Sequence, residues 1–500
     1  SIFGANTEMR GGDAYASPRL SDAYSDILKS TSWNQYNHNF NATLLQETAF
    51  NSNSAGAFEC WSSHYDRIRR ENEFLRDAAE FGSKFGEDWL KIRIAEVRFC
   101  RAYAYFMLCR VYGGVILRTE VDGPEQNDKA RSTEEECWGF IINELKELAP
   151  DLPLKWDSDN SGRATQKAAY GLLSRVALYA EKWDVAAQAA RDCATAEGNL
   201  DLSENGYAKI FELGINSPEV LFAVEFKSSV IDHAYDAYVR PSGDTKELGK
   251  QVYSGFVPTS ELVDSYEMAG DGGNFSWEEH GKDPYANREP RFYATILYNG
   301  ADWMGRKIES FVGGKDGYKA YENAGAAGTT VTGYYLRKYL IDGDKTWVTS
   351  GSGQDWIVLR YAEVLLNKAE ALAMENWNKN SAEALQALND VRARVGLPAR
   401  ATADKETFLE YVRHERKVEL AGEGFRYWDL RRWRLAEKVI DGQNVHGVKI
   451  SKQSDGSFTY EQVDADGGHK RIFYDRYYRF AIPLSERSNN SLCTNNDGWI

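Results

Sequence analysis

The pattern of hydrophobic and polar positions predicts helices in two separate blocks of the chain. In residues 58–81, ring and aliphatic side chains recur every three or four positions between basic residues. The same period continues over residues 87–112 and stops at Gly113 and Gly114. Glycine is the usual residue at which a helix ends. Two long helices are therefore expected near the start of the chain.

More helices follow these two. Residues 132–136 are typical of a capped helix start, and the helix is expected to reach residue 148 before Pro150. Residues 165–197 predict a helical hairpin with a tight turn at 181–182, whose small side chains let the two helices approach closely. Helical periodicity returns over residues 359–374, 381–395, 406–420 and 424–440.

The chain between and after these blocks has a different character. Residues 198–350 are rich in Gly, Asp, Asn and aromatic residues, with short strand-like runs at 220–226 and 334–340. Long loops in a compact domain are usually functional or mobile. Residues 441–480 predict one or two hairpins, and the tail is expected to be extended.

Together these patterns predict a mainly α fold in which a helical-repeat scaffold carries a loop-rich insert with short β-hairpins. The pairs at 165–197 and 359–395 resemble tetratricopeptide units of about 34 residues. We expect a single domain over 1–500, with the scaffold at 58–197 and 355–440, the insert at 198–354, and a hairpin and tail at 441–500.

Charge and composition exclude several classes of protein. The formal net charge is −15, so no counterion release would drive binding to nucleic acid. No apolar run approaches the ~18 residues of a membrane-spanning helix. The six cysteines form no CxxC pair and no short disulfide framework.

Several motifs, in a fixed order, resemble those of the SusD/RagB family of outer-membrane nutrient-binding lipoproteins. They lie at residues 61–72, 95–115, 360–371, 388–397, 415–433, 481–484 and 495–499. The most specific segment, 415–433, contains Gly424-Phe425-Arg426-Tyr427-Trp428-Asp429-Leu430. Members of the family begin with a signal peptide and a lipid-modified Cys, and we expect such a segment to precede this chain.

The resemblance implies a non-catalytic protein at the extracellular face of the outer membrane, held there only by a lipid anchor absent from this chain. Such a protein captures an oligosaccharide and passes it to a TonB-dependent SusC-like transporter. The helical-repeat face would hold the transporter, since repeat scaffolds present extended docking surfaces.

Two loop regions combine flat rings with amides, which is the chemistry that a sugar face requires. Aromatic rings cover the C–H surface of a sugar, and Asn or Gln side chains bond its paired hydroxyls. The first region contains Trp33, Asn34, Tyr36 and Asn37. The resemblance places the ligand face of the family at this N-terminal loop and at the central insert.

The second region lies in that insert and supplies Trp277, Arg288, Tyr298 and Trp303 as candidate ligand contacts. Packing of the insert's own small core is the alternative for each of these side chains. Trp61 is a further candidate, because its helical position indicates the core and its neighbourhood indicates a ligand wall. Trp183, Trp428 and Trp433 are assigned to packing.

Acidic side chains in the 415–433 motif offer a catalytic interpretation, which we do not adopt. Glu415 and Glu419 lie one helical turn apart. Arg416, Arg426, Arg431 and Arg432 are nearby and are expected to neutralise these carboxylates in pairs that hold helices together. In the family, the motif belongs to the scaffold.

No cofactor is expected. His414-Glu415 begins like a zinc-binding HExxH motif, but Val418 stands where the second His would be. Residues 157–162 imitate the opening of a calcium-binding loop, yet Ala168 occupies the position of the bidentate Glu. A structural calcium ion at this loop is kept as the alternative.

Two other functions stay open. A RagB-like protein would capture peptides, through main-chain hydrogen bonds and polar pockets. A helical glycosidase would need two carboxylates about 5–10 Å apart, and no motif recommends such a pair. The Trp content of the loops favours glycan over peptide.

Overall fold

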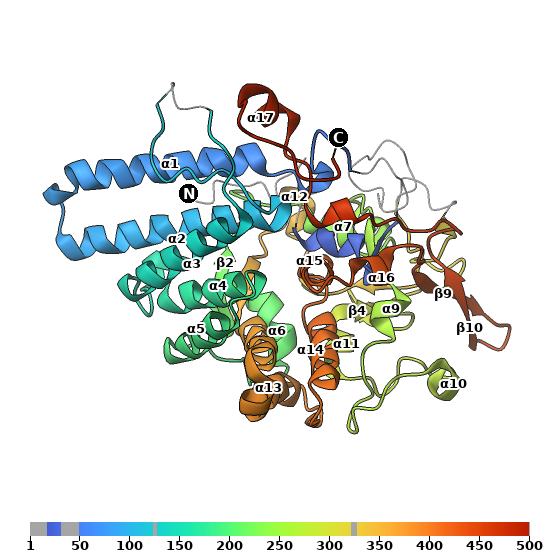
Figure 1. Ribbon diagram of the computed structural model, residues 1–500. Coiled ribbons are helices and arrows are strands. Elements are labelled where there is room, and N and C mark those ends of the chain that lie inside the picture. Colours follow the sequence, from blue (N-terminus) through green and yellow to red (C-terminus); the bar gives the residue numbers. More distant parts are fainter. Residues whose placement is uncertain (1–17, 32–49, 124–127, 322–327, 500) are drawn as a thin grey trace.

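The computed structural model describes residues 18–31, 50–123, 128–321 and 328–499. Its first block of helices comprises α1 (Trp61–Phe81), α2 (Glu87–Tyr112), α3 (Glu134–Leu148), α4 (Gln166–Tyr179) and α5 (Trp183–Thr195). Each packs against the next along the chain, and they lie together on one side of the molecule (Figure 1). The predicted bounds 87–112 of α2 are confirmed, and α3, α4 and α5 begin or end within two residues of the predicted bounds.

Local chemistry explains where these helices begin and end. Thr133 forms a capping box with Glu136: the Glu136 amide donates to the Thr133 hydroxyl at 3.2 Å, and the Thr133 amide donates to Glu136 at 2.8 Å. Gly113 ends α2 with a φ of +75°, a conformation that favours glycine.

The second helical block packs onto the first. Helix α13 (Tyr361–Arg394) contacts α4, α5 and α14 (Lys405–Glu419). Asn376 has non-helical φ and ψ, so α13 consists of two helices that meet at this residue. This agrees with the two helical segments predicted at 359–374 and 381–395. Two shorter helices follow, α15 (Arg426–Arg432) and α16 (Ala436–Ile440).

The insert holds short helices and two-stranded sheets. Its helices are α6 (Gly206–Leu213), α7 (Tyr235–Val239), α8 (Asp244–Leu248), α9 (Ser260–Val263), α10 (Trp277–His280), α11 (Pro290–Thr295) and α12 (Trp347–Ser350). Its strands form antiparallel pairs, two of them with strands outside the insert: β3 (Phe256–Pro258) with β1 (Leu28–Ser30) and β2 (Val220–Val224) with β8 (Trp356–Arg360). The other two pairs are β4 (Ile296–Leu297) with β7 (Tyr335–Leu336) and β5 (Asp302–Trp303) with β6 (Arg306–Lys307).

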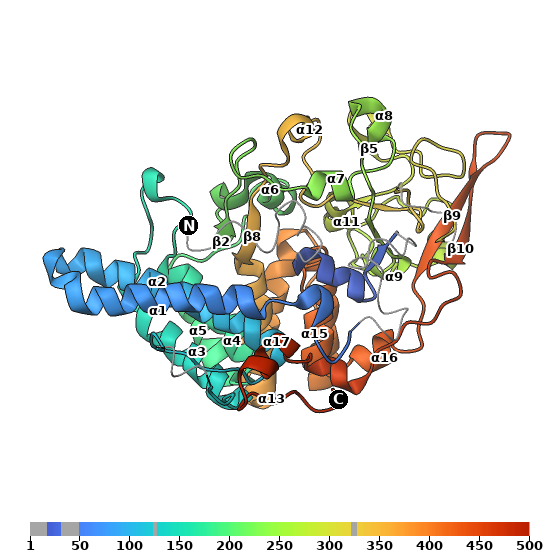
Figure 2. The ribbon, with the colours of Figure 1, turned by 90° about the horizontal axis from the view of Figure 1, so that it is seen from above.

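Strands β2 and β8 join the two ends of the insert, so that it leaves and re-enters the scaffold at one place. The C-terminal region forms the hairpin of β9 (His446–Lys452) and β10 (Phe458–Asp464), which lies on the side opposite α1–α5 in both views (Figures 1 and 2). The tail is not wholly extended as predicted, because residues Leu484–Asn489 form α17. These helices, with their short two-stranded sheets, confirm the mainly α fold.

Candidate functional site

Aromatic rings from several parts of the insert and from the C-terminal hairpin meet in one cluster. The Trp277 ring lies 5.9 Å from Tyr460, Tyr460 lies 5.8 Å from Tyr285, and Tyr285 lies 4.6 Å from Tyr298 (ring centroids). We call this group the insert aromatic cluster; it comprises Phe275, Trp277, Tyr285, Phe292, Tyr293, Tyr298, Tyr334 and Tyr460. The structure therefore brings two of the predicted contacts, Trp277 and Tyr298, into one continuous group.

The cluster has a buried layer and a partly exposed layer. Phe275, Tyr285, Phe292 and Tyr334 are buried. Trp277, Tyr293, Tyr298 and Tyr460 are partly exposed and rest on them. Partly exposed rings that are held in place by a buried layer supply a large apolar contact area at low entropic cost. The cluster is thus suited to bind a flat ligand with C–H surfaces, such as a sugar ring.

The carboxylate of Asp264 fixes the orientation of Trp277. Ser276 caps the short helix α10, and the Trp277 indole N–H donates to Asp264 Oδ2 at 2.9 Å. The second oxygen of Asp264 is buried and has no hydrogen-bond partner among the described residues. Burial raises the pKa of the Asp264 carboxyl from its ordinary 3.8 to about 6.

Replacement of Asp264 by Asn should therefore change the pH dependence of stability. Because the folded-state pKa is raised, Asp264 contributes stability that is complete below about pH 4 and is lost as the pH rises through about 6. Asn does not titrate. The free energy of unfolding of Asp264→Asn, relative to wild type, should rise by about 2 kcal/mol between about pH 4 and pH 7.

Urea unfolding at several pH values measures this difference. The control is Asp302→Asn, because the Asp302 side chain is exposed and pairs with Lys307, which is exposed as well. Profiles of Asp264→Asn and wild type that stay parallel over this range would show that Asp264 does not titrate as inferred.

A hollow of about 360 Å³ adjoins the cluster and shares Tyr293 with it. Polar side chains line it: Asn205, Lys209, Glu212 and Arg337. Burial raises the pKa of Tyr298, and the positive charge of Arg337 opposes that rise. Sequence reasoning missed these residues because they lie on or beside α6 and β7, outside any aromatic and amide pattern.

Two predicted contacts, Trp303 and Trp61, take packing roles instead. Trp303 is fully buried, and its indole donates to Asp244 at 3.0 Å beneath the guanidinium of Arg240. Trp61 is buried between Tyr65 and Tyr112, and its indole donates to Glu486. For these two indoles the alternative interpretation, packing, is the one that the structure supports.

Arg288 is also buried and acts as a support for the cluster. Its guanidinium donates to the carbonyls of Val263, Tyr266 and Pro284 and lies over the rings of Phe275 and Phe292. Its two terminal nitrogens donate to the backbone, so Arg288 holds the buried layer in place. Trp33, Asn34, Tyr36 and Asn37 lie outside the described residues, and their role stays a prediction.

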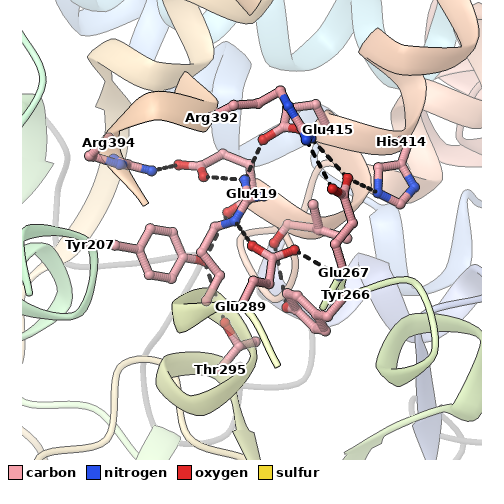
Figure 3. A network of polar contacts seen from close by, with 12 residues as sticks. Tyr207, Tyr266, Glu267, Glu289, Thr295, Arg392, Arg394, His414, Glu415 and Glu419 are labelled. Carbon is pink, nitrogen blue, oxygen red and sulfur yellow. Dashed lines mark hydrogen bonds and ion pairs between the residues drawn. The ribbon is translucent and has the colours of Figure 1, made fainter. Parts of the chain in front are cut away.

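Glu415 and Glu419 lie in a buried network of ion pairs, as Figure 3 shows. Glu415 accepts from Arg291 at 2.5 Å and Arg392 at 3.0 Å. Glu419 accepts from Arg291, Arg360 and Arg394. Each side chain is at most 1% exposed. The predicted structural role of both carboxylates is therefore supported.

The predicted partners of these carboxylates were wrong. Arg416 pairs with Asp429, Arg426 with Asp26, and Arg432 with Asp429 and Glu370. Arg431 donates to backbone carbonyls. The guanidinium groups that neutralise Glu415 and Glu419 come instead from α11, β8 and the end of α13.

The structure gives the proposed calcium loop a local role. The Asp157 side chain caps the turn at Ser158–Asn160 by accepting from the Asn160 amide. Among the described residues, no three His, Cys, Asp or Glu side chains gather in a group that could hold a metal ion.

Comparison with known families assigns the chain. A profile described as the SusD family matches residues 218–499, which is more than half of the chain. This protein belongs to the SusD family. A second profile, described as starch-binding and associating with the outer membrane, matches residues 4–178 of this SusD-family protein. That description places the protein at the outer membrane.

Individual relatives agree with the assignment. A SusD-like protein of Bacteroides ovatus is 26% identical over 452 residues, which are 85% of this chain and 74% of the relative. The crystal structure of a SusD-like protein from Bacteroides fragilis is 27% identical and has a TM-score of 0.83, over 96% of this chain and 93% of that one.

The fold is also that of surface glycan-binding protein A from Bacteroides thetaiotaomicron, solved in complex with laminarihexaose. That chain is 18% identical, with a TM-score of 0.69 over 96% of this chain and 93% of its own. Within the described part of this SusD-family protein, no helix is both long and apolar enough to span a membrane.

Proposed function

We propose that this SusD-family protein captures an oligosaccharide outside the cell, without cleaving it, and delivers it to a TonB-dependent SusC-like transporter. The observation that carries the proposal is the insert aromatic cluster, in which four partly exposed rings rest on four buried ones. Laminarihexaose bound to a protein of the same fold supports a glycan as the ligand class.

Binding without catalysis agrees with the state of the two candidate carboxylates. Glu415 and Glu419 are both buried and paired with arginines. Burial by itself would raise the pKa of Glu419, but Arg394, Arg360 and Arg291 lower it well below its ordinary value. A carboxylate held in this way is a poor proton donor, which a glycosidase acid must be.

The first experiment is a screen of the purified protein against soluble polysaccharides and oligosaccharides, by affinity electrophoresis and then by calorimetry. For the glycan that binds, we expect Trp277→Ala and Tyr298→Ala each to weaken binding about tenfold or more. Loss of the apolar contact of one ring costs on the order of 1.5 kcal/mol, and 1.4 kcal/mol corresponds to tenfold.

The matched control is Trp89→Ala. Trp89 is an exposed tryptophan that stacks on Phe85 at the start of α2, on the side of the molecule opposite the hairpin β9–β10 (Figure 1). The Trp89→Ala variant should bind the glycan like wild type. Trp277→Phe should keep part of the glycan affinity that Trp277→Ala loses. If both cluster variants bind a cognate glycan like wild type, the site is wrong. A uniformly negative panel together with recovery of mixed peptides would favour the peptide-binding function.

The transporter and the membrane anchor are further parts of the proposal. We place the transporter on the helical-repeat face, because stacked helical pairs such as α4–α5 with α13 present an extended surface. A lipid group would hold the protein at the extracellular face of the outer membrane. Co-purification of the full-length protein with its transporter from detergent-solubilised membranes tests the partnership, and recovery of the protein without a transporter would contradict it.

A further inference from the structure

A second cavity lies in the scaffold, among α2, α3, α4, α13, α14 and α15. Its volume is about 340 Å³, within the range of small-molecule sites. Six arginines line it, against three glutamates, although the whole chain has a net charge of −15. The cavity is thus locally positive in an acidic protein. We call it the scaffold cavity.

Two of the three glutamates are already committed to other partners. Arg479 Nε donates to Glu134 at 2.8 Å, and Trp138 donates to the same carboxylate at 3.1 Å. Arg432 and Trp433 donate to Glu370 in the same way, at 2.7 and 2.9 Å. These pairs neutralise Arg479 and Arg432. Of the other lining arginines, Arg413 pairs with Glu410 and Arg434 with Asp475.

Arg110 and Arg431 have no carboxylate partner among the described residues. Arg431 donates to the carbonyls of Tyr478, at 2.7 Å, and of Arg110, at 3.5 Å. Arg110 contacts the sulfur of Met107. Both guanidiniums lie over the ring of Trp428, at 4.3 Å for Arg110 and 4.7 Å for Arg431.

Unused hydrogen-bond donors accompany this uncompensated charge. The Nε atoms of Arg110 and Arg431 and the indole nitrogen of Trp428 are buried, and none has a partner among the described residues. Arg431 and Trp428 are only 4% and 3% exposed. A buried donor without a partner is costly, and a buried charge without a counter-ion is more so.

Arg431 keeps its charge in this environment. Burial, together with the charges of Arg479 and Arg110, lowers its pKa from the ordinary 12.5 to about 10. It is therefore protonated at neutral pH. A guanidinium presents a planar fork of donors that matches a carboxylate.

We infer that the scaffold cavity binds the carboxylate of a small ligand, held by Arg110 and Arg431 beside the Trp428 indole. Two sources of this chemistry are a free organic acid and a sugar acid. This site is separate from the insert aromatic cluster, and the inference does not depend on the glycan that the cluster binds.

Calorimetry of the whole protein tests the inference with succinate, glucuronate, glucose and sulfate, all in chloride buffer. We expect saturable binding of succinate or glucuronate and no binding of glucose. Tighter binding of glucuronate would identify a sugar acid as the source, and tighter binding of succinate would identify an organic acid. Failure of both carboxylates to bind, or equal binding of sulfate, would overturn the inference.

Arg431→Met and Arg110→Met should each weaken carboxylate binding at least tenfold. The matched control is Arg69→Met, an exposed arginine of α1, which should bind like wild type. Glycan binding at the insert aromatic cluster should be unchanged in all three variants. If Arg431→Met fails to fold, the partly exposed Arg110 still supplies the test, and unchanged carboxylate affinity in Arg110→Met would refute the site.

Discussion

Replacement of Glu419 by Gln should lower the free energy of unfolding by about 3–5 kcal/mol, the cost of removing one partner from a buried ion pair. One carboxylate here faces three guanidiniums: Arg360 at 2.6 Å, Arg291 at 3.0 Å, and Arg394. Gln keeps the shape and removes the charge, so these arginines would stay buried with too little negative charge around them. Urea unfolding of wild type and variant at neutral pH measures the loss.

The pH dependence and a surface control sharpen this test. Because the folded-state pKa of Glu419 is lowered, the stability that its carboxylate contributes is present above the ordinary pKa of 4.5. This stability is lost as the pH falls below that value. The difference in unfolding free energy between Glu419→Gln and wild type should therefore become smaller at acidic pH. Glu73→Gln removes an exposed partner of Arg69 and should cost no more than about 0.5 kcal/mol. Similar losses in the two variants would contradict a special role for the buried network.

Much of the scaffold could be predicted from the sequence, because its helices carry their own signals. The period of α2 and the glycine after it defined residues 87–112, and the Thr133 capping box marked the start of α3. The insert could not be resolved in this way. Pairs such as β4 with β7 involve two residues on each strand, and their partners lie about 40 positions apart. The hydrophobic periodicity of a short segment does not indicate which distant strand it pairs with.

The same limit applies to the partners of individual side chains. Glu415 and Glu419 were correctly assigned to the scaffold, but their arginines come from positions as distant as Arg291. Chain proximity favoured Arg416, which instead bonds Asp429. A buried carboxylate takes the guanidinium that the fold places beside it, and only tertiary structure shows which one that is.

The candidate site shows this limit for aromatic residues. Trp277 and Trp303 both follow polar, turn-rich segments, so composition treats them alike. The structure leaves Trp277 partly exposed on the cluster and buries Trp303 completely. Tyr460 was missed because it lies on the hairpin β9–β10, well over a hundred positions from the other rings. Whether a ring faces solvent depends on the segment packed over it.

Replacement of Trp303 by Ala should therefore reduce stability and not glycan affinity. Its indole donates to Asp244, beneath Arg240, whose guanidinium also lies over Trp347. Truncation of a fully buried Trp leaves a cavity and costs about 3–5 kcal/mol of unfolding free energy. The loss also removes one hydrogen bond from the buried Asp244 carboxylate, which Arg306 continues to hold at 2.8 Å.

Urea unfolding and calorimetry on the same preparation separate the two effects. Under conditions in which Trp303→Ala is still folded, it should bind the cognate glycan within about twofold of wild type. Trp277→Ala should show the opposite behaviour, with weaker binding and a smaller loss of stability, since its ring is already partly exposed. A Trp303→Ala variant that unfolds like wild type but loses glycan affinity would contradict this assignment. Trp303 would then belong to the ligand site, and the insert would have to open to expose its buried indole.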